Sequence, residues 1–171
     1  MKIRLASEEL LTDSIVDGEG LRAVIWTQGC SHHCKGCHNP ETWDFKAGFL
    51  TDTDTVKKKI DELAMQDGIT FSGGDPFFQL DACIDIAKYA KEKGLNIWSY
   101  TGFVFEDLLN NAKAKEFLKY VDVLIDGPFQ IDKKSLLATY RGSTNQRIIN
   151  VKKSLKDGKV HQIKKYDRNR K

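Results

Sequence analysis

From residue 22 onward, short apolar segments alternate with longer amphipathic segments, and this pattern restricts the possible folds more than any other feature of the chain. The apolar segments suit buried strands, and they cover residues 22–28, 68–74, 95–100, 121–127 and 147–151. Strands that are separated by helices predict a parallel sheet with crossover helices. The sequence therefore predicts the α/β fold class.

The amphipathic segments predict three helices between these strands. The predicted helices lie within residues 51–66, 75–94 and 105–120. In the first, Val56, Ile60 and Leu63 recur at helical spacing and form an apolar face. In the second, Pro76 suits the first turn of a helix and Gly94 suits its end.

The length of the chain limits how far such a sheet can close on itself. A closed eight-stranded barrel needs about 250 residues, whereas this chain has 171 residues and offers four or five strand–helix units. We therefore expect an open partial (β/α) barrel with a mainly parallel sheet, formed by residues 1–151 as one domain. Ligands of open α/β sheets bind at the carboxyl ends of the strands. The loops that follow residues 28 and 72 would share that edge.

Composition and hydropathy favour a cytoplasmic protein. Hydrophobic residues make up 40% of the chain, and no segment approaches the roughly 20 consecutive apolar residues of a membrane span. The first residues, MKIRLASEELLTDS, lack the apolar run of a signal peptide. In a reducing compartment, clustered thiols indicate metal binding or redox chemistry rather than structural disulfides.

Positive charge is concentrated at the end of the chain. Residues 151–171 contain nine Lys and Arg against two Asp, a formal charge of +7, while the whole chain carries +3. Residues 152–171 are therefore expected to form a basic C-terminal tail, which could contact an acidic partner. No aromatic or glycine-rich recognition pattern accompanies these charges, so the sequence does not favour a nucleic-acid partner. A solvated and partly disordered tail is the simpler interpretation.

Three of the four cysteines lie together in the loop after the first predicted strand. Cys30, Cys34 and Cys37 form a C-x3-C-x2-C pattern. Three thiolates can hold three irons of a [4Fe-4S] cluster and leave the fourth iron open to a ligand. Alternatively, a structural zinc site could use a histidine of the same loop as its fourth ligand. Cys83 lies on the apolar face of the second predicted helix and is expected to be a packed core thiol.

The cysteine pattern and a second segment together resemble the radical S-adenosylmethionine enzymes. The second segment is TFSGGDP, residues 70–76, at the end of the next predicted strand. The resemblance implies one [4Fe-4S] cluster held by Cys30, Cys34 and Cys37, whose open iron is chelated by S-adenosylmethionine. It also implies cofactor contacts from Gly36, Cys37, His38, Gly73, Gly74 and Asp75. Taken alone, SGGDP is also an ordinary helix start, with Asp75 as the N-cap.

Longer segments resemble one group within that superfamily, the glycyl radical enzyme activases. Residues 14–45 carry the Asp-Gly-x-Gly-x-Arg lead-in and the Cys-His-Asn that closes the cysteine loop. Residues 98–108, 123–129 and 141–148 are similar to the activases of anaerobic ribonucleoside-triphosphate reductases. This resemblance implies reductive cleavage of S-adenosylmethionine to a 5′-deoxyadenosyl radical, which takes a hydrogen atom from a glycine of the reductase. A one-electron donor such as flavodoxin would reduce the cluster.

Further contacts to the cofactor are expected where later strands end. Ser99, Tyr100, Thr101 and Asp126 are candidates for ribose or methionine contacts. Asn145 lies in a polar segment that reads either as a turn before the last strand or as a cofactor contact. No general base is expected, because hydrogen-atom abstraction does not require one.

Two positions depart from the wider superfamily. Gly36 stands where an aromatic residue near the adenine is common, and Asp75 replaces a glutamate. Three functions stay open on the sequence. The favoured one is the activase, and the second is a radical enzyme that acts on another glycyl radical enzyme or on a small molecule, as a 7-carboxy-7-deazaguanine synthase does. The third is a zinc-stabilised binding module.

Overall fold

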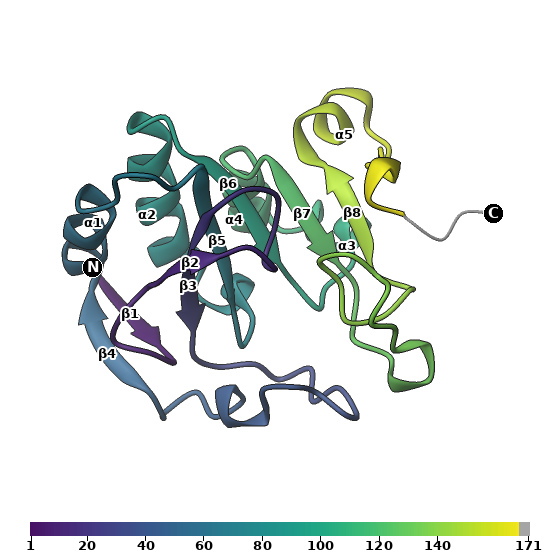
Figure 1. Ribbon diagram of the computed structural model, residues 1–171, viewed down its shortest axis with the longest axis horizontal. Helices are drawn as coiled ribbons and strands as arrows, with labels where there is room; N and C mark the ends of the chain where they lie inside the picture. Colours follow the sequence, from purple (N-terminus) through teal and green to yellow (C-terminus); the bar gives the residue numbers. More distant parts are fainter. Residues whose placement is uncertain (168–171) are drawn as a thin grey trace.

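The computed structural model describes residues 1–167, in which the five predicted strands lie side by side in one eight-stranded sheet (Figure 1). The strand order is β4-β1-β3-β5-β6-β7-β8, and β2 pairs with β3 outside this path. The strands are β1 (Lys2–Leu5), β2 (Leu11–Ser14), β3 (Arg22–Thr27), β4 (Phe49–Asp52), β5 (Gly68–Gly73), β6 (Asn96–Tyr100), β7 (Val123–Asp126) and β8 (Arg147–Asn150). The chain thus has the predicted α/β class.

The sheet is mixed, so the expectation of a mainly parallel sheet is wrong. Only the central pairs β3–β5, β5–β6 and β6–β7 are parallel among the described residues. At one edge, β8 is antiparallel to β7 because the connection between them carries no crossover α-helix. At the other edge, β1, β2 and β4 add antiparallel pairs. Curvature of this sheet into an open partial barrel stays a prediction.

The helices form between the predicted strands but are shorter than their patterns indicated. They are α1 (Thr53–Asp61), α2 (Leu80–Glu92), α3 (Phe105–Leu108), α4 (Ala112–Leu118) and α5 (Val151–Asp157), with the 3-10 turns η1 (Pro40–Thr42), η2 (Pro76–Phe78), η3 (Ile131–Lys133) and η4 (Lys164–Tyr166). The helix predicted over 105–120 is divided because Asn111 caps a new helix by accepting a hydrogen bond from the backbone of Ala114. Within the described part of the chain, no helix is long and apolar enough to cross a membrane.

The two faces of the sheet differ in what covers them. On one face, Ile25, Phe71 and Ile97 join the buried core that includes α1, α2 and α4. On the other face, Trp98 packs in a smaller cluster with residues of β7, β8 and later segments. In Figure 1 the β2–β3 connection crosses β5 on this second face, and the loops after β3 and β7 lie at the same edge of the sheet. The second face is therefore covered by loops and not by helices.

The C-terminal residues 152–167 pack against the domain and do not form the expected solvated tail. Val151 and Ser154 of α5 are buried, and an antiparallel bridge joins Gln162 to Ile149 of β8. The boundary predicted at residue 151 therefore falls inside packed structure, at the first residue of α5. Residues 168–171, the end of the predicted tail, lie outside the described residues.

Candidate functional site

The cysteine loop leaves the carboxyl end of β3 and folds back against its own start. The amide of Gln28 donates hydrogen bonds to the backbone oxygens of Glu41, at 2.9 Å, and Asp44, at 2.8 Å. The backbone N–H of Cys30 donates to the oxygen of Trp43 at 3.1 Å. These bonds close residues 28–44 into one unit at the edge of the sheet where ligands of α/β proteins bind.

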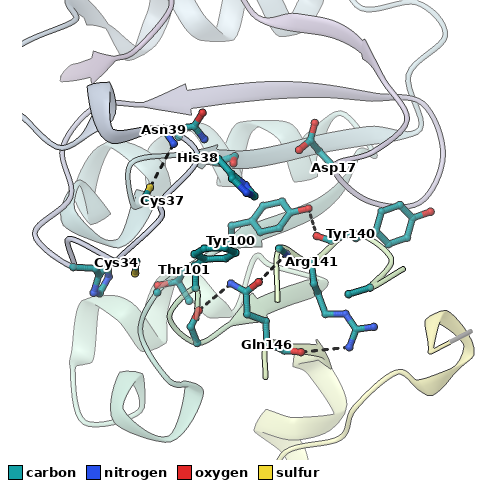
Figure 2. Close-up of a pocket in the computed structure, with 18 of the residues that line it drawn as sticks. Asp17, Cys34, Cys37, His38, Asn39, Tyr100, Thr101, Tyr140, Arg141 and Gln146 are labelled. Carbon is teal, nitrogen blue, oxygen red and sulfur yellow. Dashed lines mark hydrogen bonds between the residues drawn. The ribbon is translucent and has the colours of Figure 1, made fainter. Parts of the chain in front are cut away.

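All three loop cysteines are free thiols that line one cavity of about 690 Å³. Cys30 is buried, whereas Cys34 and Cys37 are half-buried. The backbone N–H of Asn39 donates to Cys37 Sγ at 3.4 Å (Figure 2). Burial raises the pKa of the Cys30 thiol to about 11, and the nearby charges of Asp75 and the other two thiols add to this effect. Binding of a metal by Cys30 therefore has to displace a proton.

The donor set of the loop fits an iron–sulfur cluster. In residues 1–167, no three His, Cys, Asp or Glu side chains are placed to share one metal ion. The three loop histidines each contact another side chain: His32 contacts Asp75, His33 stacks on Trp43, and His38 packs against Phe129. In a cluster each thiolate binds a different iron, so three thiols that share a cavity wall suit it.

Gly73 and Gly74 allow the turn after β5 to approach the backbone of the cysteine loop. A Cβ atom at Gly73 would lie 2.2 Å from the oxygen of Thr27, and one at Gly74 would lie 2.4 Å from the oxygen of Gly29. Backbone hydrogen bonds run from Gly74 to Thr27 at 2.8 Å and from Asp75 to Gly29 at 3.0 Å. Both glycines line the cavity. Glycine is required at these two positions because the backbone of β3 and the cysteine loop lies so close. The sequence interpretation had instead explained the two glycines by close approach of the ligand.

Asp75 has a saturated, buried carboxylate. Its Oδ1 accepts a hydrogen bond from the backbone of Phe77 at 2.9 Å, which confirms it as the cap of the turn. Its Oδ2 accepts from the hydroxyl of Thr101 and the backbone of Gly102, both at 2.9 Å, and lies 2.7 Å from His32 Nε2. Asp75 is 1% exposed and is not among the described residues that line the cavity. A contact between this carboxylate and the ammonium group of a ligand would require one of these bonds to break.

The structure divides the remaining predicted contacts into two groups. His38, Tyr100 and Thr101 line the cavity with the cysteines. Gly36, Ser99, Asp126 and Asn145 are not among the described residues that line it. Ser99 is fully buried, and Gly36 lies against Ile131, whose Cδ1 would be 2.4 Å from a Cβ atom at Gly36.

Asp126 and Asn145 have structural partners near β8. Asp126 accepts hydrogen bonds from Arg147 at 2.6 Å and from the backbone of Phe105 at 2.8 Å. Asn145 Nδ2 donates to the oxygen of Pro128 at 2.8 Å. These contacts fix the end of β7 and the long loop after it, beside the cavity.

Sequence reasoning missed several residues of the cavity. They are Asp17, Trp26, Asn39, Ser72, Tyr140, Arg141 and Gln146, together with flanking loop residues. Trp26 and Ser72 are register partners on neighbouring parallel strands, so the alternation of side chains along β3 and β5 could have predicted them. In Figure 2 the cysteines lie at one end of the drawn pocket, Asp17 and Tyr140 lie at the other end, and Tyr100 lies between them. The loop residues carry no periodic signal.

Comparison with known proteins agrees with this geometry. Residues 16–149 match a family model described as a 4Fe-4S single cluster domain. Among curated relatives, anaerobic ribonucleoside-triphosphate reductase-activating proteins from Pasteurella multocida and Haemophilus influenzae are 34% and 36% identical, each over 78% of this chain and 90% of the relative. The protein of that name from Enterobacteria phage T4 is 38% identical over 78% of this chain and 86% of the relative. The chain therefore belongs to the family of anaerobic ribonucleoside-triphosphate reductase-activating proteins and carries its 4Fe-4S single cluster domain.

Proposed function

We propose that this protein is an iron–sulfur activase that cleaves S-adenosylmethionine reductively and generates a glycyl radical on anaerobic ribonucleoside-triphosphate reductase. One observation carries the proposal: three free thiols of a single loop face a cavity large enough for a nucleoside-sized ligand. The names of the relatives support the reductase as the partner.

The three thiols are the protein ligands in this proposal. Cys30, Cys34 and Cys37 would each hold one iron of a [4Fe-4S] cluster, which leaves one iron open to the amino and carboxylate groups of S-adenosylmethionine. With a cluster bound there, one electron from a donor such as flavodoxin would be available for the reductive cleavage of S-adenosylmethionine to methionine and a 5′-deoxyadenosyl radical. No proton transfer by a side chain is needed in that step.

The cavity walls would orient the bound S-adenosylmethionine. The backbone at Gly73 and Gly74 borders the cysteines and would contact the methionine end. His38, Tyr100 and Thr101 would contact the rest of the ligand. The hydroxyl of Tyr100 donates to the backbone oxygen of Tyr140 at 2.6 Å, so its ring is held as a fixed wall. Burial raises the pKa of Tyr100, which keeps that hydroxyl neutral and able to donate.

We assign Asp75 a positioning role instead of a direct contact with the ligand. Its carboxylate accepts hydrogen bonds from His32 of the cysteine loop, from Thr101 and Gly102 after β6, and from the backbone of the turn after β5. One buried side chain therefore joins the three segments that border the cavity. Ser99 and Asp126 stay outside the proposed ligand contacts for the reasons given above.

The open side of the cavity favours a polypeptide substrate over a small molecule. Ile15, Val16 and Leu136 line the cavity there and are 70%, 69% and 96% exposed. Exposed apolar side chains that are grouped around a cavity indicate a surface for another protein. A reductase segment that carries the target glycine would cover them.

The test combines the anaerobically reconstituted protein with a reductant, S-adenosylmethionine and a candidate reductase. We expect methionine and 5′-deoxyadenosine as products, and a glycyl radical doublet on the reductase in electron paramagnetic resonance. The Cys34→Ala variant should give neither. Cleavage without a radical on any reductase would favour the small-molecule alternative, and a protein that binds zinc but no iron would favour the binding module.

A further inference from the structure

The segment 159–167, called here the C-terminal strap, lies beyond the part of the chain that matches the family model, which ends at residue 149. It follows α5, whose helix ends at Gly158 in the left-handed conformation, with φ of +70°. The strap then runs along β8. The backbone of Ile163 donates to Ile148 at 2.7 Å, and that of Asn150 donates to His161 at 2.8 Å. The strap is thereby fixed to the edge of the sheet.

An aromatic cluster joins the strap to the loop-covered face of the sheet. Tyr166 of the strap packs edge-on against Trp98 of β6, with ring centroids 5.8 Å apart, and against Tyr140, at 5.2 Å. Trp98 and Tyr140 also contact each other, at 5.3 Å. Tyr140 lines the cavity, so the strap packs directly behind one of its walls.

The strap also contacts the connection between β2 and β3. The hydroxyl of Tyr166 donates to the carboxylate of Glu19, and Lys165 forms an ion pair with the same carboxylate at 3.3 Å. The backbone oxygen of Glu19 accepts a hydrogen bond from the buried Arg22 at 2.9 Å. Asp17, two residues before Glu19, lines the cavity. The strap thus binds the β2–β3 connection at Glu19, two residues from the cavity-lining Asp17.

A third contact reaches the long loop after β7. Asp167 pairs with Arg141 at 2.9 Å, and the side chain of Arg141 is only 11% exposed. Arg141 lines the cavity beside Tyr140. Two adjacent strap residues therefore contact the two loops beside the cavity: Tyr166 contacts both loops, through Glu19 and Tyr140, and Asp167 pairs with Arg141 of the second loop.

We propose that the C-terminal strap positions these two loops, residues 14–21 and 134–142, with Tyr166 and Asp167 as positioning residues for the cavity. The loop-positioning role rests on the described contacts alone, whereas its effect on ligand affinity rests on the proposed function.

The test uses three variants in the full chain: Tyr166→Phe, Asp167→Asn and the two combined. Hydrogen–deuterium exchange is followed at Leu21, Arg141 and Gly142, whose backbone N–H groups donate hydrogen bonds to the Asp67 carboxylate, the Ala138 backbone oxygen and the Gln146 side chain, respectively. We expect faster exchange at Leu21 in Tyr166→Phe, at Arg141 and Gly142 in Asp167→Asn, and at all three in the double variant. Lys159→Ala, an exposed strap position, is the matched control and should not alter exchange.

The second measurement is the affinity of the cluster-loaded protein for S-adenosylmethionine. Each variant removes a hydrogen bond that involves a charged group and helps to fix a cavity wall. We therefore expect the double variant to bind S-adenosylmethionine about tenfold more weakly than the unaltered protein does. The iron content of the double variant should stay unchanged. Asp167→Glu keeps a carboxylate for Arg141, so it should bind S-adenosylmethionine as tightly as the unaltered protein. Unchanged exchange in all three variants would overturn the strap proposal. Failure of the unaltered protein to bind S-adenosylmethionine would instead overturn the proposed function, and exchange would still decide the role of the strap.

Discussion

The pairing of His32 with Asp75 shows how individual side chains join the cysteine loop to the rest of the cavity. The ring of His32 lies between Phe78 and Phe103, with centroid distances of 5.5 and 4.5 Å, and its Nε2 is 2.7 Å from Asp75. A Cβ atom at Gly102 would lie 2.6 Å from this ring. His32 therefore acts as a tether from within the loop, two residues from the ligands on either side of it.

We predict that His32→Ala lowers both stability and cluster content. Loss of a buried hydrogen bond to a carboxylate should cost about 1.5–3 kcal/mol, and the loop should lose its fixed position. His33→Ala is the matched control, since His33 is an exposed residue of the same loop. Thermal unfolding and iron per chain are measured for both. Full iron content in His32→Ala would show that the loop keeps its shape without the tether.

At the scale of elements, the turn after β5 explains why the Gly-Gly pair is needed. The turn lies against the backbone of the cysteine loop, so even a methyl group at Gly74 would meet backbone oxygens of Gly29, at 2.4 Å, and Thr42, at 2.9 Å. Backbone atoms cannot move aside as a flexible side chain can. The strand, the turn and the cysteine loop are thus one packed unit.

We predict that Gly74→Ala reduces stability by about 1–3 kcal/mol through overpacking and also reduces cluster content. Gly94→Ala is the control, because a Cβ atom there meets nothing within 4 Å although φ is +78°. It should cost about 1–2 kcal/mol through backbone strain and leave iron content unchanged. If Gly74→Ala kept its full iron content but did not bind S-adenosylmethionine, the glycines would be needed for contact with the ligand and not for packing against the loop.

The central strands could be predicted from sequence, whereas the edges of the sheet could not. β3, β5, β6 and β7 are buried runs whose apolar residues mark them clearly. By contrast, β2 and β4 are four residues long and contain one buried residue between them, Ser14, so neither periodicity nor burial distinguishes them from loops. The direction of β8 was also missed, because local sequence does not encode which way a strand returns.

The candidate site shows the same division. The cysteines and the Gly-Gly pair line the cavity, and they could be singled out in the sequence because chemistry and spacing mark them. The walls contributed by residues 14–21 and 134–142 were not found, because tertiary contacts alone bring them to the cavity. Asp75 was singled out for a contact with the ligand. Its carboxylate instead accepts hydrogen bonds from segments that are far apart in sequence.

At the scale of the whole molecule, helices cover one face of the sheet, and loops with the C-terminal strap cover the other. The cavity opens between these loops, where Ile15, Val16 and Leu136 are exposed. A partner protein that covers these exposed side chains would meet the cavity there. In the proposed function, the cluster would lie at the three cysteines and the reductase would contact these exposed apolar side chains.

We predict that Leu136→Asp slows glycyl radical formation several-fold while cleavage of S-adenosylmethionine continues, because a charge would face an apolar interface. Stability should change by no more than about 0.5 kcal/mol, as for other exposed positions. Met65→Asp is the control, since Met65 is 80% exposed but lines a different pocket. Equal radical yields from the two variants would place the reductase elsewhere.

The most direct test of the account is electron paramagnetic resonance of the anaerobically reconstituted and reduced protein, recorded before and after addition of S-adenosylmethionine. We predict a [4Fe-4S]⁺ signal that shifts when S-adenosylmethionine binds, is lost in Cys37→Ala, and is retained in Cys83→Ala, because Cys83 is fully buried away from the cavity. A cluster signal that does not respond to S-adenosylmethionine, or that survives the loss of Cys37, would contradict the proposed three-thiolate site with an open iron.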